Sequence, residues 1–205
     1  MKYKKREFSF LKKSKLVFII LIIFPQISLA TDITLGFNLG YREIKDPDLK
    51  EIYGDGYVYK PNLKYFPHEM WGLELSYEGG YKKEALVGSF QEESTLNVSG
   101  VQLCGVFRFR AGFLEPYFKF GVAAFSYKQD IQSQYVRRKV DHHQWTSVIG
   151  GGAQFKVSRM LFFIAELEYI PLIVKPFEKE VDLGRFRGLL GIGLNIPLKK
   201  LHHSE

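Results

Sequence analysis

The feature that most constrains this chain is an alternation of apolar residues with small or polar ones at every second position. The first segment with this pattern covers residues 33–42, and the pattern recurs up to residue 196. Side chains of a β-strand point alternately to its two faces, so each segment is predicted to be a strand with one apolar and one polar face. No segment after residue 30 shows a sustained helical period, which indicates an all-β fold.

The alternation predicts eight strands of about ten residues or slightly more. Pro61 lacks a backbone donor and makes the second strand one of the weaker predictions. In the fifth strand the face assignment is ambiguous, because Lys119 belongs inside and shares its parity with Phe125 and Tyr127; a bulge near Ala123 and Ala124 would reconcile them. The predicted strands cover residues 33–42, 56–65, 71–78, 101–110, 116–128, 146–157, 161–169 and 185–196.

The predicted connections alternate in length. Long ones cover 43–55, 82–94, 129–144 and 174–182, and short ones cover 66–69, 111–115 and 158–160. An even number of strands with long loops at one end is typical of an outer-membrane β-barrel. The alternative is a soluble exported β-sandwich or a lipocalin-like barrel, in which the apolar faces point inward.

The composition of the two faces favours the membrane barrel. Glycines recur on the polar faces, and small residues suit the inside of a narrow barrel. Aromatic residues bound the apolar faces in two sets, as in a surface that faces a bilayer. The expected girdles are Tyr41, Tyr57, Tyr77 and Tyr169 near the long loops, and Tyr65, Trp71, Phe113 and Phe155 near the short turns.

The N-terminus has the features of a secretory signal peptide. Residues 1–15 are basic, residues 16–24 are uniformly apolar, and Ser28-Leu29-Ala30 resembles a cleavage site. The apolar run is roughly half as long as a membrane-spanning helix needs, which makes an uncleaved anchor the alternative. Residues 1–30 are therefore predicted to be a signal peptide, 31–198 the barrel, and 199–205 a short tail.

Removal of the signal peptide changes the charge balance. It takes away seven of 29 Lys and Arg residues and one of 22 Asp and Glu residues, so the net charge falls from +7 to 22 − 21 = +1. The basic character thus belongs to the export segment, and no nucleic-acid partner is expected. The single cysteine, Cys104, excludes an intramolecular disulfide and a multi-cysteine metal site.

Charged residues on the polar faces are predicted to meet inside the barrel. Folding the last two strands about residue 178 brings Glu168 opposite Arg187, where they would pair. Because an unpaired charge in such a lumen is costly, we expect a closed polar lumen rather than an ion pathway. The predicted lumen network comprises Arg42, Glu74, Arg108, Glu166, Glu168, Arg185 and Arg187.

Basic residues in the expected long loops point to lipopolysaccharide, whose phosphates pair well with Lys and Arg. Another extracellular ligand or protein is equally open, because loops on a rigid barrel diverge freely. The predicted phosphate contacts are Lys82, Lys83, Arg137, Arg138 and Lys139.

The histidines argue against an enzyme. A lipid-modifying barrel enzyme needs a His with a nearby Ser, and often an acid. His68, His142, His143, His202 and His203 fall in predicted turns, loops or the tail, and no serine lies nearby on a strand. No catalytic residue, cofactor site or metal site is predicted.

Three segments resemble one known superfamily. They are 33–41, the Pro-Tyr segment 115–121, and Gly150–Ala153 together with Glu166–Tyr169. They are similar to the small eight-stranded outer-membrane β-barrels of the OmpA-barrel, OmpX and OmpW kind. The resemblance implies an up-and-down barrel in the bacterial outer membrane, inserted by the barrel assembly machinery.

The C-terminus departs from this pattern. Family members often end on an aromatic residue that the assembly machinery reads, whereas this chain continues past Ile196 into a polar tail. Residues 194–198 are the candidate for that signal here.

Together these observations predict a monomeric barrel with a structural or surface-interaction role in the cell envelope. Two alternatives stay open: a membrane-embedded lipid-modifying enzyme, and a narrow channel or carrier for small hydrophobic molecules.

Overall fold

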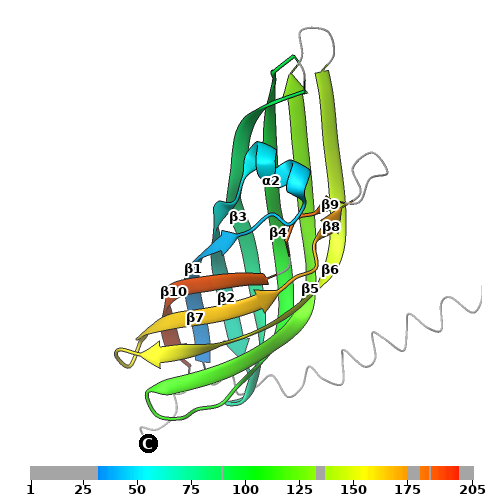
Figure 1. The fold of residues 1–205 in the computed structure, drawn as a ribbon. Coiled ribbons are helices and arrows are strands. Elements are labelled where there is room, and N and C mark those ends of the chain that lie inside the picture. The colour runs from blue at the N-terminus through cyan, green and yellow to red at the C-terminus, as the bar shows by residue number, and fades with distance from the viewer. Residues whose placement is uncertain (1–31, 89, 133–136, 175–180, 185, 199–205) are drawn as a thin grey trace, which may run out of the picture.

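The computed structural model describes residues 32–88, 90–132, 137–174, 181–184 and 186–198. The predicted signal peptide and tail lie outside this part. Eight antiparallel strands form a closed barrel in the order β1-β10-β7-β6-β5-β4-β3-β2 (Figure 1), which confirms the predicted fold class. They are β1 (Asp32–Arg42), β2 (Gly56–Phe66), β3 (Trp71–Val87), β4 (Glu92–Arg108), β5 (Leu114–Gln132), β6 (Arg137–Lys156), β7 (Leu161–Tyr169) and β10 (Phe186–Pro197).

The first and last barrel strands close the sheet. β1 pairs with β10 over its whole length, from Asp32 opposite Pro197 to Arg42 opposite Arg187. Closure leaves no free sheet edge within the ring, which is the condition for strands to lie in lipid. Within the described residues, no helix is both long and apolar enough to cross a bilayer.

The outer surface of the ring is an apolar belt. Leu73, Leu103 and Phe120 are each at least half exposed, and similar side chains project from every strand of the ring. Aromatic contacts occur towards the end that bears the long connections. There Tyr41 meets Tyr57 edge-on at 5.7 Å between ring centroids, and Tyr169 lies 4.9 Å from Phe186. An exposed belt of this composition is a surface that faces hydrocarbon.

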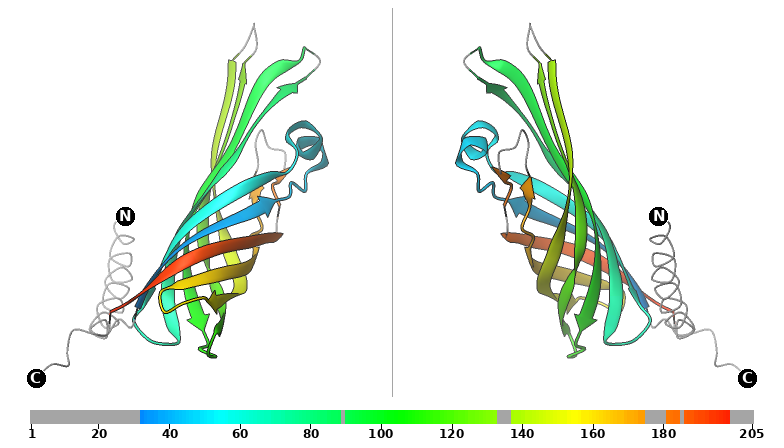
Figure 2. Two further views of the ribbon diagram at one scale, coloured as in Figure 1. Left: turned by 90° about the vertical axis from the view of Figure 1, so that its left-hand side faces the viewer. Right: turned by 90° about the vertical axis from the view of Figure 1, so that its right-hand side faces the viewer.

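Four strands continue past the ring. β3 to β6 are 17 to 20 residues long, whereas β1, β2, β7 and β10 have 9 to 12. The extra length forms a curved four-stranded sheet, here called the protruding sheet (Figures 1 and 2). It comprises residues 81–87, 92–99, 126–132 and 137–147.

The protruding sheet corrects two predicted loops. Most of residues 82–94 lies in the β3–β4 hairpin, and most of residues 129–144 lies in the β5–β6 hairpin. Both faces of this sheet carry polar residues, such as Lys82, Glu93 and Asp130 on one and Lys83, Ser94 and Gln129 on the other. On the second, inward face these polar residues are mixed with buried Leu96 and Val98, so the sheet lacks the regular apolar alternation from which the other strands were predicted.

The first long connection contains a helix that the periodicity did not predict. Helix α2 (Pro47–Tyr53) begins at the N-cap Asp46, whose side chain accepts a 3.0 Å hydrogen bond from the Leu49 amide. Asp at the N-cap followed by Pro at N1 is a helix-start signal that the sequence does contain. The helix lies beside β3 (Figure 1), and its last residue, Tyr53, is buried.

β5 does not contain the bulge that would have reconciled its two faces. β5 pairs with both neighbours without a register shift, and Lys119, Phe125 and Tyr127 all point inward. The bulge lies in β3 between Glu78 and Tyr81, where Gly80 has a φ of 94°. A residue with a side chain would be strained at that φ.

Phe125 and Tyr127 point inward because the barrel interior is not polar throughout. Strand residues such as Tyr81, Leu96 and Val98 join them in a buried cluster, here called the outer apolar cluster. Two connections complete it: α2 contributes Tyr53, and a small hairpin of β8 (Ile173–Val174) and β9 (Val181–Asp182) contributes its valines. Part of the apolar content therefore lies inside the barrel mouth.

A test of this packing uses two glycines of β4. A Cβ on Gly100 would lie 2.5 Å from the Phe125 ring, whereas one on Gly105 would meet nothing closer than 3.8 Å. We expect Gly100→Ala to lower the free energy of unfolding in detergent micelles by about 1–3 kcal/mol through overpacking. Gly105→Ala is the matched control, and equal urea midpoints for the two variants would contradict the inward position of Phe125.

Candidate functional site

The middle of the barrel holds one connected set of buried charges, here called the central network. Its members are polar-face residues of strands that lie far apart in the sequence, and each is at most 6% exposed. Ion pairs join five cations and four carboxylates: Arg42, Lys60, Lys64, Lys119 and Arg187 with Glu74, Glu78, Glu166 and Glu168.

Glu166 lies at the centre of the lower half of this network. Its carboxylate accepts hydrogen bonds from Lys119 at 2.7 Å, from Lys60 at 3.0 Å and from the Tyr117 hydroxyl. Lys119 also donates to Glu74 at 2.9 Å. The network therefore links strands on opposite sides of the barrel.

Three carboxylates of the network come close enough together to bind a cation. One oxygen each from Glu74, Glu166 and Glu168 lies within 4.8 Å of the others. The ammonium groups of Lys60 and Lys119 pair with all three carboxylates. The lysines thus supply the positive charge that a metal ion would supply in such a cluster.

The neighbouring strands make room for these long side chains. On β6, Gly150 and Gly152 face the network, and a Cβ on Gly150 would lie 3.1 Å from Cε of Lys119. On β4, Gln102 donates a 3.3 Å hydrogen bond to Glu78. Glycines on the polar face of β6 therefore make space for the lysine that β5 points inward.

The upper half of the network is built around arginines. Arg187 lies opposite Glu168 in the β10–β7 register, and its Nη2 donates to that carboxylate at 2.9 Å. This is the cross-strand pair that the folding of the last two strands predicts. Arg42 and Arg187 both bind Glu78.

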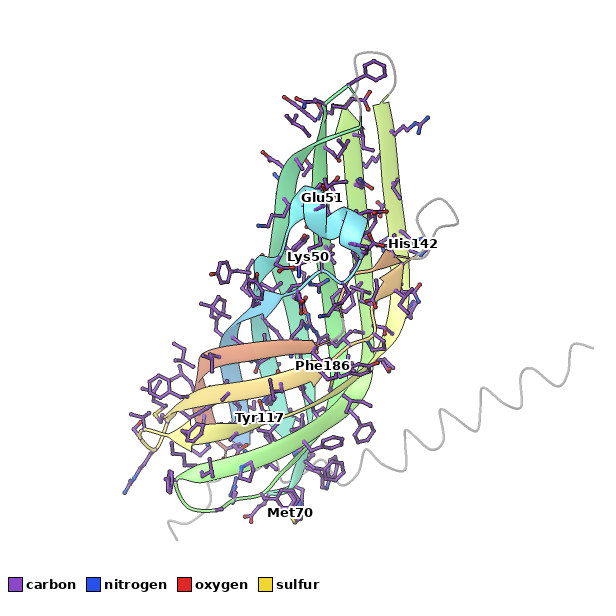
Figure 3. The ribbon with its side chains drawn as sticks, viewed as in Figure 1. Lys50, Glu51, Met70, Tyr117, His142 and Phe186 are labelled. Carbon is purple, nitrogen blue, oxygen red and sulfur yellow. The ribbon has the colours of Figure 1, made fainter. Side chains whose placement is uncertain are left out.

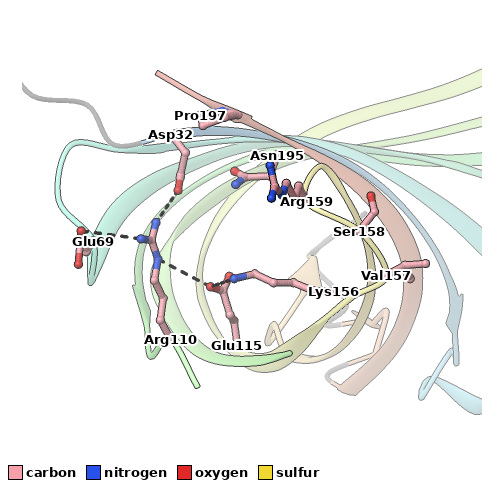
Figure 4. Close-up of a pocket in the computed structure, with 10 residues that line it drawn as sticks. All are labelled: Asp32, Glu69, Arg110, Glu115, Lys156, Val157, Ser158, Arg159, Asn195 and Pro197. Atoms are coloured by element: carbon pink, nitrogen blue, oxygen red, sulfur yellow. Dashed lines mark hydrogen bonds and ion pairs between the residues drawn. The ribbon is translucent and has the colours of Figure 1, made fainter. Parts of the chain in front are cut away.

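Arg108 belongs to a second, separate set of charges at the short-turn end. It donates to Asp32 at 2.7 Å, and its guanidinium lies 3.6 Å from the centroid of the Phe66 ring. Arg110 also binds Asp32 at 2.7 Å, and Lys156 pairs with Glu115 at 2.7 Å. Asp32, Arg110, Glu115 and Lys156 border an open hollow of about 590 Å³ (Figure 4).

The seven predicted lumen residues therefore do not form a single network. Arg42, Glu74, Glu166, Glu168 and Arg187 are linked to one another, and Arg108 lies in the set at the short-turn end. Arg185 is outside the described residues. The alternation placed the three lysines of the network, Lys60, Lys64 and Lys119, inside the barrel, but they were not assigned to the predicted lumen network. Tyr117 was not identified. Tyr117 lies two residues before Lys119 and therefore on the same face of β5. This spacing is the signal that could have identified Tyr117.

The structure does not bring the predicted phosphate contacts into one patch. Lys82 and Lys83 lie on β3, and Arg138 and Lys139 lie on β6, with β4 and β5 between them. Lys82 pairs with Glu84 at 3.5 Å, and Lys139 lies opposite Asp130. Arg137 begins β6, but its side chain is outside the described part of the structure.

The described histidines lie at opposite ends of the molecule. His142 and His143 are successive residues of β6 and point to opposite faces of the protruding sheet, where Figure 3 labels His142. His143 lies 3.7 Å from the Asp141 carboxylate, and His68 accepts a hydrogen bond from the Met70 amide. Within the described part of the chain, no serine is hydrogen-bonded to any of these three side chains.

The central network predicts a large cost for removing one charge. Glu166→Gln leaves Lys60 and Lys119 short of a buried partner, so we expect the free energy of unfolding to fall by about 3 kcal/mol or more. Glu84→Gln, which alters an exposed pair, should leave it nearly unchanged. Urea titration in micelles measures both variants, and similar midpoints would show that the network does not stabilise the barrel.

Comparison with known proteins supports the fold. No family model and no curated protein matches the chain. Among solved structures, OprG from Pseudomonas aeruginosa aligns with a TM-score of 0.62 at 14% identity, covering 84% of this chain and 99% of OprG. The N-terminal β-barrel domain of Pseudomonas aeruginosa OprF aligns with a TM-score of 0.53 at 19% identity, covering 82% of this chain and 99% of the OprF domain.

A third solved structure is Ail, the attachment invasion locus protein of Yersinia pestis, in complex with the heparin analogue sucrose octasulfate. It aligns at a TM-score of 0.52 with 16% identity, covering 82% of this chain and 98% of Ail. The apolar belt of the closed ring and this shared fold place the protein in the outer membrane. The chain therefore has the fold of the small eight-stranded outer-membrane β-barrels.

Proposed function

We propose that this protein is a closed outer-membrane anchor that presents the protruding sheet outside the cell, in a structural or surface-interaction role. The observation that supports the proposal is the extension of β3 to β6 beyond the ring (Figure 2), where one face of the protruding sheet carries polar residues such as Lys82, Glu93 and Asp130. A sheet of this kind on a rigid barrel is suited to contact with lipopolysaccharide or a protein partner.

Two layers of side chains support a closed lumen. The central network fills the middle of the barrel with long side chains that pair across it. Above it, the outer apolar cluster joins strand residues to Tyr53 of α2 and to the β8–β9 hairpin. An eight-stranded barrel encloses just enough space for its own side chains.

We infer that the protein acts as a monomer inserted by the barrel assembly machinery.

A narrow carrier for small hydrophobic molecules is the second candidate. β2 pairs with β3 only as far as Gly79, and β6 pairs with β7 only from Ile149 onward. Beyond these points the interior is the outer apolar cluster, which would suit a hydrophobic solute if the connections moved aside. Uptake of a fluorescent hydrophobic probe into vesicles that contain the protein would favour this candidate.

Closure of the lumen can be tested by conductance. We expect the purified protein in planar bilayers to show no stable steps of porin size, because long charged side chains bridge the lumen. An established porin in the same bilayers is the positive control. Reproducible large steps from this protein alone would contradict the closed lumen.

Contact with lipopolysaccharide can be tested through the basic residues of the protruding sheet. Replacing Arg137, Arg138 and Lys139 together by Ala removes three cations that could pair with phosphates, so we expect less lipopolysaccharide to copurify with the barrel. Arg159→Ala, in the turn at the opposite end, is the control. An unchanged amount of bound lipid in the triple variant would exclude these residues as the contact.

A further inference from the structure

Two arginines of the central network lie in an unfavourable arrangement. Arg42 of β1 and Arg187 of β10 are direct cross-strand partners, and both side chains are buried. Like charges directly opposite each other on neighbouring strands are destabilising. Glu78 binds both guanidinium groups, but it supplies only one negative charge for the two.

The rest of the network does not remove the imbalance. Arg187 also pairs with Glu168, but Glu168 is shared with Lys60 and Lys119. Among the residues that the structure describes, the connected set has five cations and four carboxylates, which is one excess positive charge. A buried excess charge is costly unless a counterion compensates it.

The same two arginines keep unused hydrogen-bond donors. Nε and Nη1 of Arg42 and Nε of Arg187 are buried and have no hydrogen-bond partner. Both guanidinium groups lie over the Phe125 ring, at 5.4 and 5.9 Å from its centroid, and an aromatic ring cannot replace a full hydrogen-bond acceptor. Buried donors of this kind require a partner with free lone pairs.

A small cavity lies beside these donors. It has a volume of about 10 Å³, close to the room that one bound water needs, and Arg42 and Arg187 both line it. The side chains of Ile170, Leu172 and Leu183 line it as well. The lining of the cavity therefore combines two arginines with apolar residues.

Glu43 also lines this cavity, but its carboxylate is held elsewhere. It accepts hydrogen bonds from Lys45 at 2.6 Å and from Lys50 at 3.2 Å, which hold the pKa of Glu43 below its ordinary value. Its negative charge is thus paired with cations outside the barrel interior.

We propose that this cavity binds one small monovalent anion, chloride under ordinary conditions, between Arg42 and Arg187. A halide ion accepts several N–H donors at once and cancels the excess charge of the network. A water molecule would accept from the arginines but would leave that charge in place, and its own protons would face mostly apolar side chains. The anion also relieves the repulsion between the two opposed arginines where β1 meets β10.

Bromide provides the first test, because its anomalous scattering distinguishes it from water. The full mature protein, extracted from outer membranes in detergent, is crystallised with bromide in place of chloride. We expect an anomalous peak between the guanidinium groups of Arg42 and Arg187. Absence of a peak there at saturating bromide would overturn the proposal, whether or not bromide binds elsewhere.

Stability in different salts provides the second test. At constant ionic strength, we expect the thermal unfolding midpoint in micelles to be higher in chloride than in gluconate, which is too large for the cavity. Arg42→Gln leaves four cations and four carboxylates, so this chloride-dependent shift should disappear. Arg108→Gln, the same change in the separate charge set, should keep it.

Equal midpoints of the wild type in the two salts would contradict the proposal, as would a chloride shift that Arg42→Gln retains in full. If Arg42→Gln does not fold, the bromide experiment on the wild type decides alone.

Discussion

The pairing of β1 with β10 is the interaction on which the rest of the structure depends. It closes the sheet, so that each of the eight ring strands pairs with a neighbour on both sides. Only a closed ring can expose Leu73, Leu103 and Phe120 to hydrocarbon without also exposing unpaired backbone groups. The apolar belt, the buried charges and the position of the connections all follow from this closure.

Closure also determines what the interior must contain. Once the apolar faces point to lipid, alternation forces the other face of each strand inward, so Lys60, Lys119 and Glu166 meet in a confined space. Their charges alternate in sign, and each is hydrogen-bonded to a partner from another strand. The ammonium groups thus link the carboxylates in the middle of the barrel.

Much of the ring could be predicted from the sequence, because each ring strand has one face in lipid. Even the cross-strand pair of Glu168 and Arg187 followed from counting residues about the last connection. The prediction failed for the strand segments that have no face in lipid. Lys82 and Asp130 lie in strand segments where polar residues occur on both faces, so the period-two signal there is weak. The face of Phe125 and Tyr127 stayed ambiguous in the sequence, because an apolar interior at the mouth depends on Tyr53, a residue in a distant connection.

The candidate site was harder to predict than the ring. The alternation shows which charged residues point inward. It does not show how far along the barrel axis each one lies, because the strands are tilted. Arg108 was therefore grouped with Arg42 and Arg187, although it pairs with Asp32 at the short-turn end. Tyr117 completes the hydrogen bonds of Glu166, and it carries no charge that would have drawn attention to it.

The central claim is that this chain forms a closed barrel in the outer membrane. Gel mobility of outer-membrane fractions, compared between boiled and unboiled samples, tests it most directly, because a closed barrel resists unfolding by detergent until it is heated. The account predicts that the protein is found in the outer-membrane fraction and that its mobility changes on boiling. A soluble periplasmic protein whose mobility does not depend on heating would contradict the account.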